Sequence, residues 1–371
     1  MIRLALFALF AVLIGCAPAV PSQATTPATP APTQGTANVT NPNPFTPAPK
    51  YSGARETVHF GGLSGSTDRA IYVAQTKGYF DDQGLVVTVD NFPSATQIIP
   101  LLATNKVDAA HGGSSPGLYN AILQGTGIRI VADVTVPRPP VPGVKDAQFV
   151  VVRKALYDQG VHTVADLKGK KVAINALGGI GHEQLEYVLK FHGLTLDEVD
   201  VQGVTYPEMP VALSNGAVDA AIVVEPFAGQ MQDMGIGVEI FNTTLALIDH
   251  TATWLFYSQD FMTQRPEVAR RFMIAWLEGM RYIEDAQIKG LHRDEAYQIM
   301  ADNTSVKDVK TWERTGIPYG DPNGEIRLPP IAADQDFFMR MGSMKQRIEP
   351  QAAVDTSFRD YAVGVLGQYM Y

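Results

Sequence analysis

The sequence contains a single cysteine and no run of basic residues. With Cys16 alone, no disulfide can form within the chain. The 29 lysines and arginines are outnumbered by 38 aspartates and glutamates, giving a net charge of −9, which argues against nucleic acid or an anionic membrane surface as a partner. No spacing of histidines and acids fits a metal site, since His182-Glu183 lacks the second histidine of the H-E-x-x-H pattern. We therefore predict no metal and no cofactor.

The first sixteen residues have the features of an export signal. Arg3 precedes an apolar run over residues 4–14 that is too short to span a bilayer. The segment Leu13-Ile-Gly-Cys16 resembles the bacterial lipobox, which implies removal of residues 1–15, a lipid on Cys16 and attachment to the extracytoplasmic side of the cell membrane. The alternative is an ordinary secretory signal followed by an incidental cysteine.

A proline-rich stretch follows the signal. Residues 16–50 hold nine prolines and one charged residue, Lys50, so they cannot bury enough apolar surface to fold. We therefore predict a tether over residues 16–54, which would keep a globular body near the membrane.

The rest of the chain alternates strand and helix patterns, which predicts an α/β fold with parallel sheets built from right-handed βαβ units. Prolines between Pro137 and Gly143 interrupt the series, and we place an interlobe crossing there. The predicted strands cover residues 57–60, 85–89, 107–110, 128–135, 149–153, the end of 164–174, 218–224 and 251–257. The predicted helices cover residues 68–78 with Asp68 as N-cap, 95–105, 182–192, 209–215, 226–234, 267–290, 294–302, 332–348 and 357–371.

One pattern occurs twice. Pro100-Leu-Leu-Ala-Thr-Asn105 leads into Val107-Asp-Ala-Ala110, and Pro210-Val-Ala-Leu-Ser-Asn215 leads into Val218-Asp-Ala-Ala221. In both cases a helix is expected to precede a buried strand, and the loops after those strands are expected at a ligand site, because open α/β sheets bind ligands at the carboxyl ends of their strands. The sequence thus predicts two half-sites.

Residues 55–371 resemble the solute-binding proteins of bacterial ABC importers of the sulfonate, taurine, nitrate and thiamine-precursor group. The segments that carry the likeness are Ala70-Ile-Tyr-Val-Ala-Gln-Thr-Lys-Gly-Tyr-Phe80, Thr163-Val-Ala-Asp-Leu-Lys-Gly-Lys-Lys-Val172, Asn215-Gly-Ala-Val-Asp-Ala-Ala221 with Glu225-Pro-Phe227, and Phe261-Met-Thr-Gln-Arg-Pro-Glu267.

The resemblance implies a two-lobed, periplasmic-binding-protein-like fold with mostly parallel sheets and a hinged cleft between the lobes. It places the first part of lobe I at 55–148, lobe II at 149–246, and the return to lobe I with C-terminal helices at 247–371. One departure is that members often carry an aromatic residue after the first strand, where this chain has Gly61-Gly-Leu-Ser64.

The loops that follow the predicted strands of lobe I supply the first candidates for ligand contact. Gly113-Ser-Ser-Pro-Gly117 has the G-x-S-x-G form of a hydrolase elbow, but Pro116 has no N–H to donate to an oxyanion. Ser114 and Ser115 are therefore interpreted as hydroxyl donors to a ligand, or else as caps of the next helix. Ser66 and Asp68, at the first helix, are further candidates, with a capping role the alternative for Asp68.

In lobe II the candidates follow two other strands. Gly178 and Gly179, before the helix that starts near His182, lack the spacing of a dinucleotide loop but leave free N–H groups for a ligand carbonyl or acid. Glu225 ends a buried strand and needs a partner, either a ligand group or Arg69. His182 is a further candidate for ligand contact, and the alternative is that it is a structural histidine.

Aromatic stacking has four candidates: Tyr72, Phe92, Phe227 and Trp254. Hydroxyls, aromatics and an acid with few cations favour a neutral, flat heterocycle, and within the family we select riboflavin, with the thiamine pyrimidine precursor or a taurine-like sulfonate as alternatives. The expected partners are this ligand, an ABC permease and its ATPase, and no nucleic acid. A rival from another class is an enzyme like the thiamine-pyrimidine synthases, which carry a cysteine cluster that this chain lacks.

Overall fold

The computed structural model describes residues 48–136, 148–247, 250 and 253–370. The chain divides into residues 1–44 and 45–371, and every described residue belongs to the second unit. The predicted signal, the lipid site at Cys16, the tether up to residue 47 and the crossing at 137–143 lie outside the described residues.

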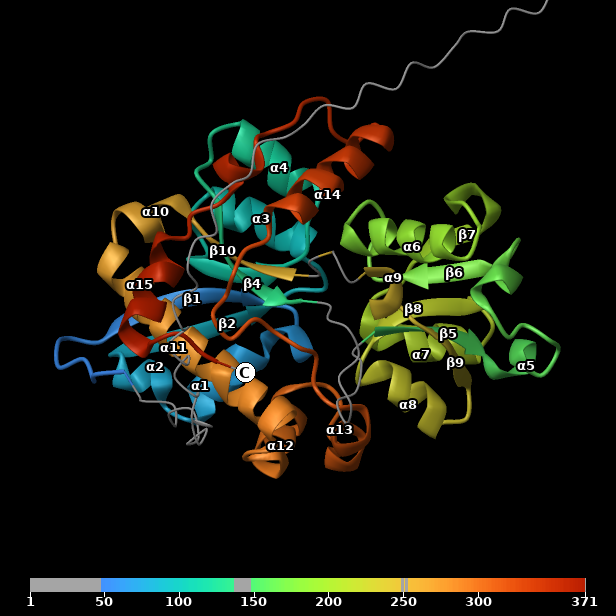
Figure 1. Cartoon of the computed structure of the whole chain (residues 1–371), viewed down its shortest axis with the longest axis horizontal. Coiled ribbons are helices and arrows are strands. Elements are labelled where there is room, and N and C mark those ends of the chain that lie inside the picture. Colours follow the sequence, from blue (N-terminus) through green and yellow to red (C-terminus); the bar gives the residue numbers. More distant parts are fainter. Residues whose placement is uncertain (1–47, 137–147, 248–249, 251–252, 371) are drawn as a thin grey trace, which may run out of the picture. The chain divides into compact units, whose positions relative to one another are not determined.

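Two five-stranded sheets organise the described part of the chain (Figure 1). We call the part built on the first sheet lobe I and the part built on the second sheet lobe II. In lobe I the strand order is β2-β1-β3-β10-β4, formed by β1 (Glu56–Gly62), β2 (Leu85–Asn91), β3 (Ala109–Gly112), β4 (Arg129–Thr135) and β10 (Thr253–Tyr257). In lobe II the order is β7-β6-β8-β5-β9, formed by β5 (Gln148–Arg153), β6 (Lys171–Ile174), β7 (Asp200–Gly203), β8 (Ala220–Val224) and β9 (Gly237–Asn242).

The two sheets have the same topology. In lobe I, β1 is parallel to β2 and β3, while β10 is antiparallel to β3 and β4. In lobe II, β6 is parallel to β7 and β8, while β5 is antiparallel to β8 and β9. Four strands of each sheet therefore run in one direction, which confirms the α/β fold with mostly parallel sheets.

The repeated sequence pattern has the same structural role in both lobes. Asp108 precedes β3 and accepts the N–H of His59 at 2.9 Å, and Asp219 precedes β8 and accepts the N–H of Lys171 at 3.0 Å. Each carboxylate also pairs with an arginine, Arg265 at 3.1 Å or Arg153 at 3.2 Å. The aspartate thus fixes the start of the central strand against its parallel neighbour.

Helices cover these sheets. Lobe I begins with η1 (Ser66–Asp68), α1 (Arg69–Thr76), α2 (Tyr79–Asp82), α3 (Ala95–Ala103) and α4 (Pro116–Leu123). Lobe II has α5 (Lys154–Tyr157), η2 (Val164–Leu167), α6 (Ile180–Phe191), η3 (Leu196–Glu198), η4 (Tyr206–Glu208), α7 (Met209–Ser214), α8 (Phe227–Asp233) and α9 (Thr244–Leu247). After β10 come α10 (Gln259–Thr263), α11 (Pro266–Glu284), the π-helical turn η5 (Asp285–Lys289), α12 (Arg293–Asn303), α13 (Val309–Thr315), α14 (Leu328–Arg340), η6 (Pro350–Ala353) and α15 (Ser357–Leu366).

Several boundaries differ from the sequence predictions. The strand predicted to start at Val107 starts two residues later, because a bend precedes Ala109. The predicted helices to 348 and 371 end at Arg340 and Leu366, in each case just before a glycine with positive φ: Gly342 at 71° and Gly367 at 76°. The strands β7 and β9 and the helix α13 have no counterpart among the predicted elements.

The strand β10 corrects one prediction. Trp254, in the strand predicted at 251–257, was expected to stack on a ligand in the cleft. Instead, Trp254 and Phe256 pack in one buried cluster, and Leu255 and Tyr257 pack in another. The reason is that β10 lies between β3 and β4 inside the sheet, with core on both sides.

One of the hydrophobic cores joins the two lobes. It contains Phe227 and Met231 of α8 in lobe II together with Trp312 of α13 in lobe I. A Cβ at Gly229 of α8 would collide with the side chain of Thr315, so the two helices approach closely where this glycine lies. We call the α8–α13 contact the apolar seam.

No helix within the described ranges is long and apolar enough to cross a membrane.

Candidate ligand-binding pocket

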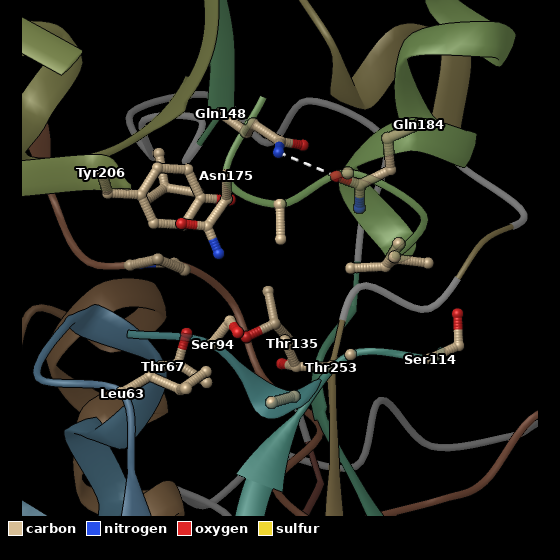
Figure 2. Close-up of a pocket in the computed structure, with 18 of the residues that line it drawn as sticks. Leu63, Thr67, Ser94, Ser114, Thr135, Gln148, Asn175, Gln184, Tyr206 and Thr253 are labelled. Atoms are coloured by element: carbon tan, nitrogen blue, oxygen red, sulfur yellow. Dashed lines mark hydrogen bonds between the residues drawn. The ribbon is translucent and has the colours of Figure 1, made fainter. Parts of the chain in front are cut away.

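A pocket with a cavity of ≈ 120 Å³ is walled by both lobes (Figure 2). Lobe I contributes Leu63, Ser66, Thr67, Ser94, Ala95, Thr96, Gly113, Ser114, Ser115, Thr135, Val136, Thr253, Pro318 and Tyr319. Lobe II contributes Gln148, Asn175, Ala176, Gly179, Ile180, Gly181, Gln184, Tyr206, Val224, Thr243, Thr244 and Leu247.

The wall is polar but carries no formal charge. Among the described residues that line it, none is an aspartate, glutamate, lysine, arginine or histidine. The polar groups are serine and threonine hydroxyls, the amides of Gln148, Asn175 and Gln184, and the phenols of Tyr206 and Tyr319. Such a wall binds a ligand through hydrogen bonds and ring contacts and offers no counter-ion to an ionised group.

Several helices start at the wall. Ser94 precedes α3, Ser115 caps α4 by accepting the N–H of Leu118 at 3.2 Å, and Gly179 precedes α6. The first N–H groups of a helix have no partner within it and carry a partial positive charge. These starts therefore favour electron-rich ligand atoms.

A chain of hydrogen bonds orients Gln184 on the lobe II side. Thr243 donates to Gln148 Oε1 at 3.0 Å, and Gln148 Nε2 donates to Gln184 Oε1 at 3.0 Å. The Gln184 side-chain oxygen accepts this hydrogen bond, which turns the amide so that its NH₂ group can donate to another acceptor. Figure 2 shows the Gln184 nitrogen pointing toward the pocket.

Some polar atoms of the wall are buried without a hydrogen-bond partner among the described residues. The side-chain oxygen of Asn175 in lobe II and the hydroxyl oxygen of Thr253 in lobe I are two of them. Leaving a buried polar group unsatisfied costs about 1–3 kcal/mol, so a hydrogen bond from a ligand or water to either oxygen is favourable. Together with Gln184, they present donors and acceptors from both lobes.

Asp68 and Tyr72, two of the predicted contact residues, lie behind the wall. Asp68 Oδ1 is 3.0 Å from His111 Nδ1, and His111 Nε2 accepts the indole N–H of Trp276 at 2.9 Å. This arrangement requires a neutral histidine with its proton on Nδ1, in keeping with burial, which lowers the pKa of His111. Asp68 Oδ2 also accepts the N–H of Leu63 at 2.6 Å and the Tyr72 hydroxyl at 3.4 Å, so it holds the Leu63–Ser66 loop at the pocket.

The expected alternatives for Glu225 were a ligand and Arg69. Its carboxylate accepts the N–H of Gly229 at 2.9 Å, and its backbone carbonyl accepts the Ser66 hydroxyl at 3.1 Å. Arg69 instead donates to carbonyls of its own lobe, those of Ser66, Val134 and Tyr319. Neither charged side chain is part of the wall, whereas Ser66 is.

Four of the predicted contact residues line the pocket: Ser66, Ser114, Ser115 and Gly179. Six do not: Asp68, Tyr72, Gly178, His182, Glu225 and Trp254. Trp254 is 1% exposed and Tyr72 is 5% exposed, and both pack in hydrophobic cores, while the His182 ring packs against Phe337 at 5.7 Å between ring centres. None of the four aromatic residues proposed for stacking belongs to the wall; Tyr206 and Tyr319 take that place.

The residues that sequence reasoning missed include Gln148, Asn175, Gln184 and Tyr206. Asn175 directly follows the strand β6, so the rule that ligands meet the carboxyl ends of strands was the signal that could have identified it. Gln148 starts a strand, Gln184 lies inside a helix and Tyr206 lies in a short 3₁₀ turn, positions without a recognisable pattern.

No group of three histidine, cysteine, aspartate or glutamate side chains in the described ranges could hold a metal ion.

Comparison with solved structures defines the class of fold. The ligand-binding component of an ABC-type import system from Staphylococcus aureus has a TM-score of 0.66 at 16% identity, covering 83% of this chain and 99% of that one. A Candida albicans protein described as having the generic periplasmic binding protein fold has a TM-score of 0.59 at 17% identity, covering 81% and 96%. The chain thus has the periplasmic-binding-protein fold, as expected.

Sequence comparison defines a narrower group than the fold does. Residues 68–287 match the model of the NMT1/THI5-like family, and the chain belongs to that family. Similar curated proteins include the nitrate/nitrite binding protein of a Nostoc species, 26% identical over 49% of this chain and 41% of that protein. A thiamine biosynthesis protein of Haemophilus influenzae is 32% identical over 41% of this chain and 44% of that protein. The chain thus spans less than half the length of each of these two relatives.

Proposed function

We propose that this protein is the substrate-binding component of an ABC importer and that it takes up a small, uncharged nitrogen heterocycle with a single ring. The observation that carries the proposal is the pocket between the lobes, which is polar on both sides and lacks charged side chains among its described residues. The likeness to a ligand-binding component of an ABC-type import system supports the transport role.

The donors and acceptors of the wall suit a heterocycle. The free NH₂ of Gln184 can donate to a ring nitrogen or carbonyl, and the Asn175 oxygen can accept from an N–H or amino group. An inorganic anion offers acceptors only, so it would leave the Asn175 oxygen without a donor. Tyr206, whose ring is stacked on Phe227 at 6.4 Å, provides a ring at the wall.

The size of the cavity favours one ring over three. A cavity of about 150 Å³ is enough for benzene, and the cavity here is ≈ 120 Å³. The thiamine pyrimidine precursor, a single ring with amino and hydroxymethyl groups, is therefore our first candidate. Riboflavin, selected from sequence with Trp254 or Tyr72 as the stacking residue, has three fused rings and becomes the second, since neither residue lies in the wall.

A small oxyanion is the remaining alternative, favoured by the helix starts at Ser94, Ser115 and Gly179. The nitrate/nitrite binding relative agrees with this possibility. An enzymatic role is the other class, supported by yeast relatives named as pyrimidine phosphate synthases, at 24% identity over 57% of this chain. We favour binding without chemistry, because Cys16 is the sole cysteine and cannot supply a cysteine cluster.

The cellular setting is part of the proposal. The Leu13–Cys16 segment supports a lipid anchor on Cys16 on the extracytoplasmic side of the cell membrane, with a permease and an ATPase as partners. Metabolic labelling with a fatty acid would test the anchor: label should enter the protein and be absent from Cys16→Ser.

The experiment that tests the ligand is calorimetric titration of the purified protein. The probes are 4-amino-5-hydroxymethyl-2-methylpyrimidine, riboflavin, taurine and nitrate. We expect the pyrimidine to bind in the micromolar range or tighter and nitrate not to bind. Binding of riboflavin alone would contradict a ligand with a single ring. Binding of taurine or nitrate alone would contradict an uncharged ligand. No binding of any probe would contradict the proposal as a whole.

A further inference from the structure

A pair of carboxyl groups meets where α6 of lobe II lies against α14 of lobe I. Glu183, on the first turn of α6, is 1% exposed, and Asp334, on α14, is also 1% exposed. Both oxygens of the Glu183 carboxyl are buried without a hydrogen-bond partner among the described residues, and the Asp334 carboxyl acts on Glu183 electrostatically. An ionised carboxylate buried without a hydrogen-bond donor is costly, and a second carboxylate nearby would repel it, so this arrangement favours a proton on Glu183.

The surroundings do not neutralise the pair with a cation. Within the described residues, neither carboxyl forms an ion pair with lysine or arginine; Arg340 of α14 pairs with Glu186 of α6 at 2.7 Å. The other titratable groups near the pair are Tyr187 on α6 and Tyr119 on α4, whose hydroxyl donates to Asp334 Oδ2 at 3.0 Å. His182 of α6 contacts Phe337, and the His250 ring packs against the ring of Tyr187 at a tilt of 40°, with 4.0 Å between ring centres.

The electrostatics agree with this geometry. Burial, and then the Asp334 carboxyl, raise the pKa of Glu183 far above its usual range, and burial raises the pKa of Asp334 to a smaller extent. Burial also raises the pKa of Tyr119, so this tyrosine stays protonated as a donor. A proton lost from the pair would leave two negative charges in an apolar site without a counter-ion.

The pair is connected to the pocket. The first turn of α6, which carries Glu183, supplies Ile180 and Gly181 to the wall. The backbone carbonyl of Ser114, also in the wall, accepts the N–H of Ile180 at 3.1 Å, a hydrogen bond between the lobes at the start of α6. We call this α6–α14 contact, with Ser114, the polar seam.

We propose that Glu183 holds a proton between the lobes, and that Glu183 and Asp334 act as positioning residues that keep the polar seam closed while that proton is bound. Loss of the proton places two like charges face to face, which separates α6 from α14 and moves Ser114 and Ile180 apart. Closure of the pocket on this side is thereby linked to pH. This inference does not depend on which ligand the pocket takes.

The first test reads the proton directly. Infrared spectra of the full chain without added ligand should contain the carbonyl stretch of a protonated carboxyl group at about pH 9, where an ordinary glutamate is ionised. The band should be lost in Glu183→Gln and kept in Glu186→Gln, the matched control on the same helix. Absence of this band from the unsubstituted protein would overturn the proposal that Glu183 holds a proton.

The second test reads the separation of the helices. Spin labels at Lys190→Cys on α6 and at Lys345→Cys after α14, in a Cys16→Ser background, report the distance across the seam, and both lysines are exposed. We expect the distance to lengthen as the pH rises in the unsubstituted and Glu186→Gln proteins. In Glu183→Gln and Asp334→Asn, which cannot place two negative charges together, it should stay short. A pH dependence that survives both substitutions would overturn the proposal.

Discussion

The two seams that join the lobes on either side of the pocket differ in kind. At the apolar seam, α8 and α13 share one hydrophobic core with the fully buried Trp312, and the side-chain ion pair Arg314–Asp233 lies half exposed at its edge. At the polar seam, α6 faces α14 with two buried carboxyl groups, the Glu186–Arg340 ion pair and the His182–Phe337 ring contact, and the Ile180 N–H donates to the Ser114 carbonyl. Burial of apolar surface depends little on pH, whereas a buried proton does.

The contrast between the seams indicates which side of the pocket can respond to pH. Separating α8 from α13 would expose a large buried tryptophan to water, at a cost of several kcal/mol. Separating α6 from α14 replaces polar contacts by contacts with water, which costs much less once the pair is ionised. We therefore expect the apolar seam to act as the fixed side and the polar seam as the opening side.

The largest effect is expected at the apolar seam. Trp312→Ala removes a side chain that is fully buried and donates its indole N–H to the Val306 carbonyl at 3.0 Å. We expect the free energy of unfolding to fall by about 3–5 kcal/mol, measured by urea denaturation. The matched control is Met234→Ala, next to α8 and 55% exposed, which should change stability by less than about 0.5 kcal/mol. Equal losses in the two variants would remove the distinction between core and surface at this seam.

The second effect is the pH dependence of stability at the polar seam. Because the pKa of Glu183 is raised in the folded protein, the folded state keeps a proton that the unfolded chain releases near pH 4.5. The contribution of this proton to the free energy of unfolding is fully present below that pH. It is lost as the pH rises, at up to about 1.4 kcal/mol per pH unit. Glu183→Gln should therefore lose less stability between about pH 5 and pH 8 than the unsubstituted protein. Unfolding curves over this range are the measurement, and identical slopes would contradict the prediction.

The third effect concerns the pocket between the seams. Thr253→Val keeps the shape of the side chain but removes a hydroxyl whose oxygen is buried without a protein partner. If a ligand uses this hydroxyl, affinity for the best probe should fall by roughly 5- to 30-fold, equivalent to about 1–2 kcal/mol. Thr263→Val, at an exposed position of α10, is the control and should leave affinity unchanged. Calorimetry decides between them, and unchanged affinity in Thr253→Val would remove this residue from the site.

The smallest effects are expected from the ion pairs of the two seams. Asp233→Asn breaks the pair with Arg314, and Glu186→Gln breaks the pair with Arg340. The arginine side chains are 39% and 53% exposed, so each substitution should cost less than about 1 kcal/mol and less still in high salt. Urea denaturation at two salt concentrations measures this. A loss of several kcal/mol in either variant would show that the seam depends on its ion pair.

The fold was largely predictable because it depends on local patterns. Alternating strand and helix segments predicted the α/β class, and the repeated segments at 107–110 and 218–221 became the central strands β3 and β8. Strand β9 was not predicted because its residues are mostly only partly buried, so no clear alternation of apolar and polar residues indicates it. Helix α13 is only seven residues long and is stabilised by packing against α8 rather than by its own pattern.

The pocket was only partly predictable. Ser114, Ser115 and Gly179 were found because loops after strands lie at the ligand edge of a sheet. Asp68 and Glu225 follow the same rule, yet their carboxylates turn to His111 and to the Gly229 N–H. Which of two neighbouring polar residues faces the pocket depends on partners more than 40 residues away or on one helical turn, and no local pattern specifies that choice.

Local sequence specifies the order of most strands and helices, the two related halves and the polar loops at the strand ends, because each depends on residues close together in the chain. Tertiary packing alone places Trp254 in the core, orients Gln184 through Gln148, and buries Glu183 and Asp334 between the lobes. Glu183 and Asp334 are 151 positions apart, since 334 − 183 = 151. Contacts over such separations arise only when the sheets have formed and the helices have packed on them.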